Sequence, residues 1–353
     1  MKFLVKKFFI LVFILFPLSS GFPQSSAIKK VLVSDYVFQP YSDEGYFQGW
    51  NYYFLNSEFQ IFVTSLISNL GPGSLNHGVA ISVQSGKTGS YFSTKEFSNK
   101  SLEANKKKYF VKSYNNSFEE INGDFEIKVF TDNVKLYLKF SSPRSGVTLS
   151  GGKIILDQKK FLKADIPFHS AKVEGYIDFK GTVYDLKGTG GMEHLITNQE
   201  VYKFSSRWEI MRSFSANGMK LFLGGYYGKK EEGDFRTFVI LDASGAILDS
   251  GKVLESKVEK FERDSLSGYK IPIVEVHSLG SEDCQFRIQK ASVAGRINIL
   301  ESISVVLRFF VKLFFANPYI LIHNTSNSLN CKHISPTPID FQGVQSHYLI
   351  NSK

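Results

Sequence analysis

The sequence predicts an all-β protein with two antiparallel β-barrels in tandem and one long apolar helix near the C-terminus. Three observations support this fold class. The composition is rich in aromatic residues and glycine, with 33 Phe, 17 Tyr and 28 Gly but only four Met, a balance that is typical of strands and turns. Short apolar or alternating runs recur along most of the chain, separated by turn residues. The 353 residues are enough for two domains of ordinary size.

Strand signals occur in two successive sets. The runs in each set end at Asn, Asp, Gly or Ser, and Asn217-Gly218 stands where a tight hairpin turn is needed. Because few helical patterns interrupt these runs, we expect antiparallel meanders that close into barrels. The clearest predicted strands are Trp50–Leu55, Gln60–Ile67, Phe125–Phe130, Val134–Phe140, Trp208–Phe214, Lys220–Tyr227, Phe235–Leu241, Ile271–Val276 and Cys284–Ile288.

The two tryptophans suggest that the two sets of strands are related. Trp50 and Trp208 each open a strand, and each is followed by a second strand with alternating apolar residues. Their separation is about the length of one barrel domain. We therefore interpret them as a weak internal repeat, with one domain over residues 28–195 and the other over residues 196–353.

One segment breaks the β pattern. Residues 301–315 are apolar apart from Glu301, two serines, Arg308 and Lys312, and Pro318 follows shortly after. This pattern predicts a helix over 301–315 that belongs to the second domain. A membrane-facing or lid helix is one interpretation. Two cations near its centre make burial in lipid costly, so we expect the helix to pack across the barrel instead.

Residues 1–27 have the pattern of a secretory signal. Lys2, Lys6 and Lys7 precede the apolar core Phe8–Pro17, and small residues follow it. We expect an exported protein, periplasmic or extracellular, with an uncleaved N-terminal anchor as the alternative. Removal of residues 1–27 takes away three Lys and no acidic residue, so the formal charge falls from +9 to +6, a surplus that is compatible with contact to an anionic membrane surface. Export and the dispersed lysines argue against a nucleic-acid partner, and the sequence does not predict an oligomeric state.

Cys284 and Cys331 are the only cysteines. In an exported chain we expect them to form one disulfide, with two buried thiols as the alternative. Two cysteines cannot form a Cys-rich zinc site, and the histidines lack the spacing that places a ligand pair on one helix. We therefore expect no metal site and no cofactor. The spacing does not address a site built from residues far apart in the sequence.

The most informative stretch of the chain is residues 171–194. It resembles the lipocalin-like superfamily that includes hydroxyneurosporene synthase, tocopherol cyclase, the fungal survival-factor proteins and some pericyclases. This superfamily has a Pro-x-x-Ala-x-Val-x-Gly strand, then a Gly-x-Gly-Tyr-x-Asp-His turn, then an aromatic strand with Trp. The resemblance implies two lipocalin-like barrels that meet at this turn. The matching positions are Pro167, Ala171–Gly175, Gly188–Gly190, Glu193, His194 and Trp208.

The predicted turn also departs from the superfamily pattern. Gly191 stands in place of Tyr, Glu193 stands in place of Asp, and Leu195–Thr197 replaces an Asn-Trp-Gly continuation. The enzymes of this superfamily act on large apolar isoprenoids. Because the polar and aromatic continuation is lost, we favour a non-catalytic, exported protein that binds a hydrophobic ligand, either a lipid or an isoprenoid.

The alternative is an isoprenoid- or lipid-modifying hydratase, cyclase or isomerase. Such chemistry needs a general acid in an apolar cavity, and Glu193 or His194 would be the proton donor. In the structural interpretation, both side chains instead join the two domains beside Trp208 and hydrogen-bond Arg207 or backbone groups. The candidate ligand-binding residues are Trp50, Tyr52, Arg207 and Trp208.

Overall fold

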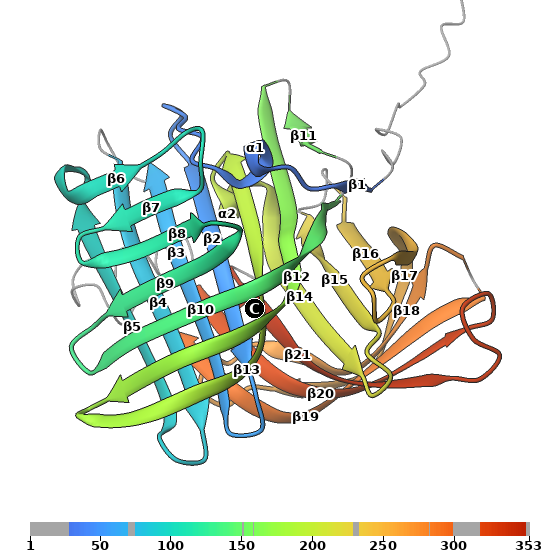
Figure 1. The fold of residues 1–353 in the computed structure, drawn as a ribbon. Helices are drawn as coiled ribbons and strands as arrows, with labels where there is room; N and C mark the ends of the chain where they lie inside the picture. Colours follow the sequence, from blue (N-terminus) through green and yellow to red (C-terminus); the bar gives the residue numbers. More distant parts are fainter. Residues whose placement is uncertain are drawn as a thin grey trace, which may run out of the picture.

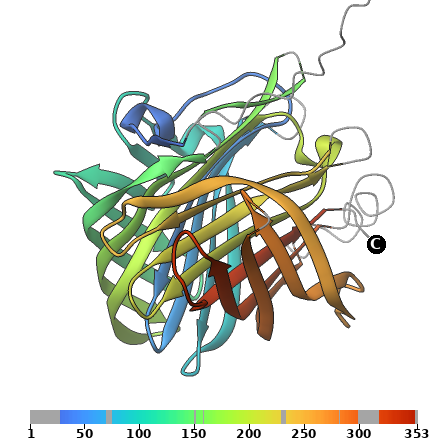
Figure 2. The same cartoon turned by 90° about the vertical axis from the view of Figure 1, so that its right-hand side faces the viewer.

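The computed structural model describes residues 28–69, 75–149, 152–157, 159–228, 233–281, 283–298 and 318–350. The export signal expected over residues 1–27 and the helix expected over residues 301–315 lie outside these ranges. The described chain forms two antiparallel sheets that follow one another in the sequence (Figure 1). The first sheet is curled but open and is called the half-barrel below. The second is a closed barrel, which faces the viewer in Figure 2.

The half-barrel has 13 strands in the order β5-β4-β3-β2-β13-β12-β10-β9-β8-β7-β6, with β1 paired to β10 and β11 paired to β12. Register shifts along the β10–β12 and β12–β13 ladders interrupt these long strands, and such bulges bend a sheet. The strands are β1 (Lys29–Lys30), β2 (Tyr46–Leu55), β3 (Phe59–Asn69), β4 (Asn76–Ser85), β5 (Gly89–Ser98), β6 (Leu102–Ala104), β7 (Phe110–Ser113), β8 (Asn116–Ile121), β9 (Asp124–Phe130), β10 (Val134–Thr148), β11 (Ile154–Asp157), β12 (Lys160–Phe179) and β13 (Thr182–Asn198).

The closed barrel is an eight-stranded meander in which β21 returns to pair with β14. Asn217 and Gly218 form the turn between β14 and β15, as their sequence predicts. The strands are β14 (Ser205–Ser215), β15 (Lys220–Gly228), β16 (Phe235–Leu241), β17 (Ile247–Arg263), β18 (Lys270–Leu279), β19 (Cys284–Asn298), β20 (Tyr319–Cys331) and β21 (Ile339–Leu349).

The fold class expected from the sequence needs correction. The prediction of an all-β chain with a second, closed barrel is confirmed, but the first sheet does not close, because β5 and β6 remain its edges. The three residues of β6 offer little backbone for pairing with the ten residues of β5. The described helices are α1 (Val33–Tyr36), α2 (Val201–Phe204) and the 3-10 turn Asn99–Ser101. The described ranges therefore contain no long apolar helix, and none of their helices could cross a membrane.

The predicted glycine-rich turn also needs correction. Residues 188–194 lie inside the continuous strand β13 and not in a turn. Glycine is required there by the close approach of β2: a Cβ on Gly190 would overlap the carbonyl oxygen of Tyr53, and a Cβ on Gly191 would overlap its phenol ring. The chain passes from β13 to the barrel further on, through α2. The expected domain division between Leu195 and Ile196 falls near the end of β13.

The interior of the half-barrel is an aromatic core. Its largest fully buried side chains include Trp50, Tyr52, Phe118 and Phe140. The segment around α1 packs against this core, where the ring of Tyr36 lies edge-on to Tyr109. It is called the covering segment below, and it contacts β2, β8 and β12.

The barrel packs its outside against the outer face of the half-barrel, which is the face turned away from the aromatic core. Alternation along β14 sends Arg207 and Glu209 into the barrel and Trp208 and Arg212 outward to the half-barrel. Small apolar clusters from both sheets hold the junction together, for example Tyr53 and Phe62 with Ile322 and Val344.

Candidate functional site

A cavity of about 350 Å³ lies at the junction of the half-barrel and the barrel. Strands β2, β12 and β13 form one wall, and β14, β15, β16 and β21 form the other. Most of the lining is apolar, and its polar residues include Asn51, Thr64, Asp165, Glu193, His194 and Thr237. Prominent apolar lining residues are Leu162, Ile166, Trp208, Ile210 and Phe222.

Of the two carboxylate residues in the lining, Asp165 pairs with His194 of the half-barrel, whereas Glu193 faces the barrel. Glu193 pairs in register with Asn51 of β2, whose amide nitrogen donates to Oε2 of Glu193 at 3.1 Å. The hydroxyl of Thr64 in turn donates to Oδ1 of Asn51 at 2.7 Å. All three residues line the cavity. They form a short polar row that crosses the outer faces of β13, β2 and β3.

The partner of Glu193 is Arg212, which comes from the barrel. Its Nε and Nη2 donate to the two carboxylate oxygens, and its side chain is 1 % exposed against 12 % for Glu193. The guanidinium also lies over the rings of Tyr53 and Phe62, at 5.6 and 5.4 Å from their centroids. This bidentate ion pair joins the two sheets at the edge of the cavity.

Tyr348 adds a phenol to the same wall. It lies on β21, lines the cavity and belongs to the same apolar cluster as Trp208. Burial raises the pKa of Tyr348, although the nearby Arg212 opposes the shift. The phenol therefore keeps its proton at neutral pH and can donate a hydrogen bond.

His194 points the opposite way, into the half-barrel. Its Nδ1 lies 3.0 Å from Oδ2 of Asp165, and its Nε2 lies 2.9 Å from the amide nitrogen of Gln48. Burial lowers the pKa of His194 despite the negative charge of Asp165, so the ring is neutral at neutral pH. An amide nitrogen only donates, which assigns the ring proton to Nδ1. Both ring nitrogens are thus engaged by the protein.

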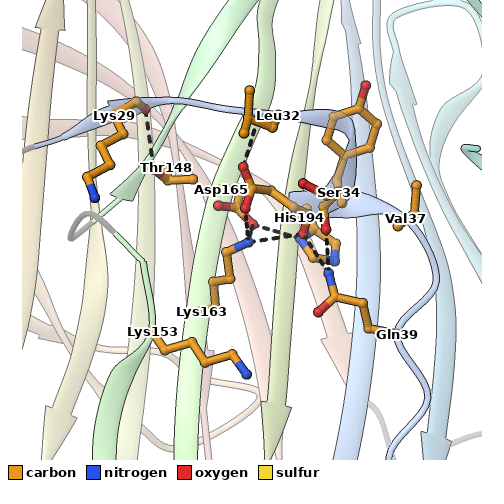
Figure 3. Close-up of polar contacts among 12 residues, drawn as sticks. Lys29, Leu32, Ser34, Val37, Gln39, Thr148, Lys153, Lys163, Asp165 and His194 are labelled. Atoms are coloured by element: carbon orange, nitrogen blue, oxygen red, sulfur yellow. Dashed lines mark hydrogen bonds and ion pairs between the residues drawn. The ribbon is translucent and has the colours of Figure 1, made fainter. Parts of the chain in front are cut away.

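The network around His194 fastens the covering segment to the half-barrel. Lys163 reaches Oδ1 of Asp35 in α1 at 2.6 Å and Oδ2 of Asp165 at 3.5 Å. Figure 3 shows Lys163 and Asp165 beside His194, directly below the segment that carries Leu32 and Ser34. This geometry assigns His194 a structural role under α1.

The structure separates the other candidate ligand-binding residues. Trp50 and Tyr52 lie in the aromatic core, where Trp50 donates to the carbonyl of Tyr36 at 2.6 Å and Tyr52 donates to Tyr109 at 2.7 Å. Arg207 lies inside the barrel, 3.8 Å from the ring centroid of Tyr227. Of the four, only Trp208 lines the junction cavity, which Glu193 also lines. The partner expected for Glu193 was Arg207, but the structure shows Arg212.

A second polar group that the sequence analysis missed lies inside the barrel. It is called the polar belt below. Its ion pair joins Lys290 to Glu275 at 3.1 Å, and Tyr227 donates to Glu209 at 3.0 Å. All of its members are buried or face inward. They are Arg207, Glu209, Tyr227, Arg236, Glu275, His277, Lys290, His323, Gln345 and His347.

Electrostatics in the polar belt are strongly perturbed. Burial raises the pKa of Glu209, and the charge of Glu275 adds to the shift. Burial lowers the pKa of His277 to about 4 and that of His323 to about 4. Polar residues at every second position, as in Arg207-x-Glu209 and Glu275-x-His277, were a signal for this belt, because alternate residues share one face of a strand.

Cys284 and Cys331 are joined by a disulfide. They are directly opposite each other where β19 begins and β20 ends. Both are buried in the apolar cluster that fills this end of the barrel.

Comparison with known proteins finds the fold but no family. No family model and no curated protein matches the chain. An AttH protein of Nitrosomonas europaea matches with a TM-score of 0.61 and 11% identity over 85% of this chain and 92% of that chain. CghA with bound Sch210972 matches with a TM-score of 0.59 and 10% identity over 87% of this chain and 89% of that chain. Kievitone hydratase from Nectria haematococca matches with a TM-score of 0.58 and 12% identity over 93% of this chain and 97% of that chain.

These solved structures are lipocalin-like barrel proteins, and the chain shares their architecture. Identities of 10–12% show a common fold and nothing about substrate. The lipocalin-like fold expected from residues 171–194 is therefore confirmed at this level. These matches do not show that the chain belongs to the hydroxyneurosporene synthase family.

Proposed function

We propose that this protein binds a hydrophobic small molecule, a lipid or an isoprenoid, in the junction cavity. The observation that carries the proposal is the cavity itself, whose apolar walls come from both sheets and whose lining includes the hydrogen-bonded row of Glu193, Asn51 and Thr64. A volume of about 350 Å³ is within the usual range of ligand pockets. Apolar walls supply affinity by removing ligand surface from water.

The polar row indicates which end of the ligand is recognised. Glu193 and the carbonyl oxygen of Asn51 are acceptors, so a hydroxyl group on an otherwise apolar molecule would find a partner there. Tyr348 offers a donor on the opposite wall. The cavity therefore suits an apolar chain or ring system that carries a single oxygen function.

Turnover of the bound molecule is the second candidate function. Two observations favour it: a carboxylate lies at an apolar cavity, and the fold is shared with kievitone hydratase. Hydratase, cyclase or isomerase chemistry would use Glu193 as the acid or base. A general acid must carry a proton on one of its oxygens. Both oxygens of Glu193 instead accept hydrogen bonds from Arg212 and Asn51. We therefore rank binding above catalysis.

Mass spectrometry of the purified protein separates the two functions. Under native conditions we expect one apolar molecule per chain, and organic extraction identifies it. Recovery of a single compound, unchanged after incubation with the protein, supports binding. Recovery of a pair that differs by water, or conversion of the extracted compound, supports turnover. If neither native spectra nor extracts contain an apolar compound, and added lipids do not bind, the proposal is wrong.

A pair of variants ties the ligand to this cavity. Ala164 lines the cavity, so Ala164→Phe fills part of its volume and should reduce the retained ligand at least several-fold. Ala291 is exposed on β19, so Ala291→Phe adds the same side chain away from the cavity and should retain the ligand. Equal retention by both variants would place the ligand elsewhere.

We further propose that the protein works after export, in the periplasm or outside the cell, where it can contact a membrane surface. The signal pattern of residues 1–27 and the disulfide support this proposal, because disulfides persist in oxidising compartments. Cell fractionation combined with mass determination of the mature N-terminus tests it. A chain found in the cytosol with residues 1–27 intact would contradict it.

A further inference from the structure

Four side chains with metal-binding atoms meet at one end of the barrel. Cys284 opens β19, Cys331 ends β20, His333 lies in the turn that follows, and Asp249 lies near the start of β17. One ligand atom from each residue lies within 4.8 Å of those from the others. The four residues come from three separate segments of the chain, so no local sequence motif indicates the group.

We propose that reduction of the Cys284–Cys331 disulfide converts this group into a zinc site. The ligands are the two cysteine thiolates, His333 and Asp249. Two sulfurs, one imidazole nitrogen and one carboxylate oxygen form a donor set that suits tetrahedral Zn²⁺. The oxidised chain does not bind the ion, because a disulfide sulfur is not a thiolate.

The existing distances are close to those of a tetrahedral site. Zinc bond lengths of about 2.3 Å to sulfur and about 2.0 Å to nitrogen or oxygen place sulfur about 3.5 Å from nitrogen, and nitrogen about 3.3 Å from oxygen. Nε2 of His333 is 3.6 Å from Sγ of Cys331 and 3.0 Å from Oδ2 of Asp249, so this one nitrogen is near both ligands. The two sulfur atoms must separate, and they lie on directly paired residues of neighbouring strands.

The surrounding backbone holds these side chains in place. The amides of Ile334 and Ser335 both donate to the carbonyl of Cys331, at 2.9 and 3.0 Å, which forms a tight turn that keeps His333 beside Cys331. The amide of Ser250 donates to Oδ1 of Asp249 at 2.7 Å and leaves Oδ2 for the imidazole or the metal.

Burial gives the site an inner and an outer side. Both cysteines are buried, whereas the side chains of His333 and Asp249 are 51% and 25% exposed. An ion can therefore arrive from solvent at the histidine and reach the two sulfurs beneath it. Apolar residues behind the sulfurs exclude water from the inner side.

The redox step balances with a dithiol as the reductant. The dithiol gives up two electrons and two protons and becomes a cyclic disulfide, and Cys284 and Cys331 become thiols. Zinc then displaces both thiol protons. Oxidation by a disulfide compound takes two electrons from the thiolates, re-forms the Cys284–Cys331 bond and releases the ion.

The test measures metal binding in both redox states of the purified full chain. A phosphine reductant is used, because a dithiol would compete for zinc. After equilibrium dialysis against zinc chloride, we expect about one zinc per reduced chain and essentially none per oxidised chain. Cobalt(II) added to the reduced chain should give the intense visible bands of tetrahedral coordination together with a thiolate charge-transfer band.

Variants show whether the proposed ligands act together. Asp249→Asn should weaken zinc binding by the reduced chain about 10- to 100-fold, and His333→Ala should weaken it further. Asp340 is exposed on β21, so Asp340→Asn is the matched control and should leave affinity unchanged. Equal zinc affinity of Asp249→Asn and the control would overturn the proposal. It would show that the thiols bind zinc without Asp249 as a ligand. Absence of binding by a reduced chain that circular dichroism shows to be folded would also overturn it.

If reduction unfolds the chain, the same variants remain informative. Zinc should then restore the β-sheet circular dichroism of the reduced wild-type chain and of Asp340→Asn, but restore that of Asp249→Asn only at higher zinc concentration. Failure of zinc to restore the fold of the wild-type chain would overturn the proposal.

Discussion

The two sheets satisfy their inward-facing polar groups in different ways. In the half-barrel, His194 and Lys163 are bound by Asp165 and by the segment around α1, and Oδ1 of Asp165 is left without a hydrogen-bond partner among the described residues. In the closed barrel, the polar belt has buried atoms with no hydrogen-bond partner among the described residues, including Oε2 of Glu209 and both ring nitrogens of His347. An open sheet can be covered by a separate segment that supplies partners. A closed barrel leaves its inward side chains to pair with one another.

This difference predicts that charge deletion costs most in the closed barrel. Lys290→Met leaves Glu275 as a buried carboxylate without its ion-pair partner, so it should lower the free energy of unfolding by about 3–5 kcal/mol. Lys257 is exposed on β17, and Lys257→Met should change stability by less than about 0.5 kcal/mol. Urea unfolding measures both values. A loss below about 1 kcal/mol for Lys290→Met would show that the belt tolerates an unpaired charge.

The second largest effect is expected from acid, which should lower the stability of the closed barrel through the polar belt. The pKa of His277 is lowered to about 4 by burial, against an ordinary value near 6.5 in the unfolded chain, although Glu275 opposes the shift. Between these values the unfolded chain binds a proton that the folded chain does not. The stability contributed by neutral His277 is therefore complete above about pH 6.5 and decreases toward pH 4, by about 3 kcal/mol.

The variant His277→Asn should remove that part of the pH dependence. Arg207, Arg236, Lys290 and Glu275 face the same space, so the remaining slope reports on the rest of the belt. Unfolding free energies at pH 7 and pH 4 test the expectation. An unchanged slope in the variant would exclude His277 as a source of acid sensitivity.

At the junction between the two sheets we expect an intermediate effect. Glu193→Gln keeps the shape but removes the charge that faces buried Arg212, so stability should decrease by about 1–3 kcal/mol while a bound ligand is retained. A catalytic role would give the opposite pattern, with nearly unchanged stability and lost turnover. Unfolding and ligand-retention measurements on the same preparation distinguish the two.

The smallest effect is expected in the half-barrel. Trp50→Phe keeps an aromatic ring in the core but removes the hydrogen bond to the carbonyl of Tyr36, so stability should decrease by about 1 kcal/mol. Hydrogen exchange of the amides around α1 should become faster, because one of its attachments is lost. Unchanged exchange would mean that the other contacts of the covering segment, including those to Lys163 and Gln48, hold it without this hydrogen bond.

Much of the local structure was determined by the sequence. The run Trp50–Leu55 lies within β2, and Asn217-Gly218 forms the turn between β14 and β15. Both were predictable because alternation and turn chemistry act over a few residues. The signal pattern and the presence of two cysteines predicted the disulfide that the structure shows. Glu193 and Trp208, which the sequence analysis singled out, both line the junction cavity.

Only the tertiary structure decided which face of each strand serves which site. Both faces of β2 are buried, so its pattern does not distinguish Trp50, which enters the aromatic core, from Asn51, which enters the cavity. The same applies to β14. Arg207 and Trp208 are adjacent but lie on opposite faces, and Arg212 lies on the same face as Trp208, where it reaches Glu193. A shift of one residue reverses every side chain of a strand. That register is set by pairing with strands far away in the chain, and a local pattern contains no information about those partners.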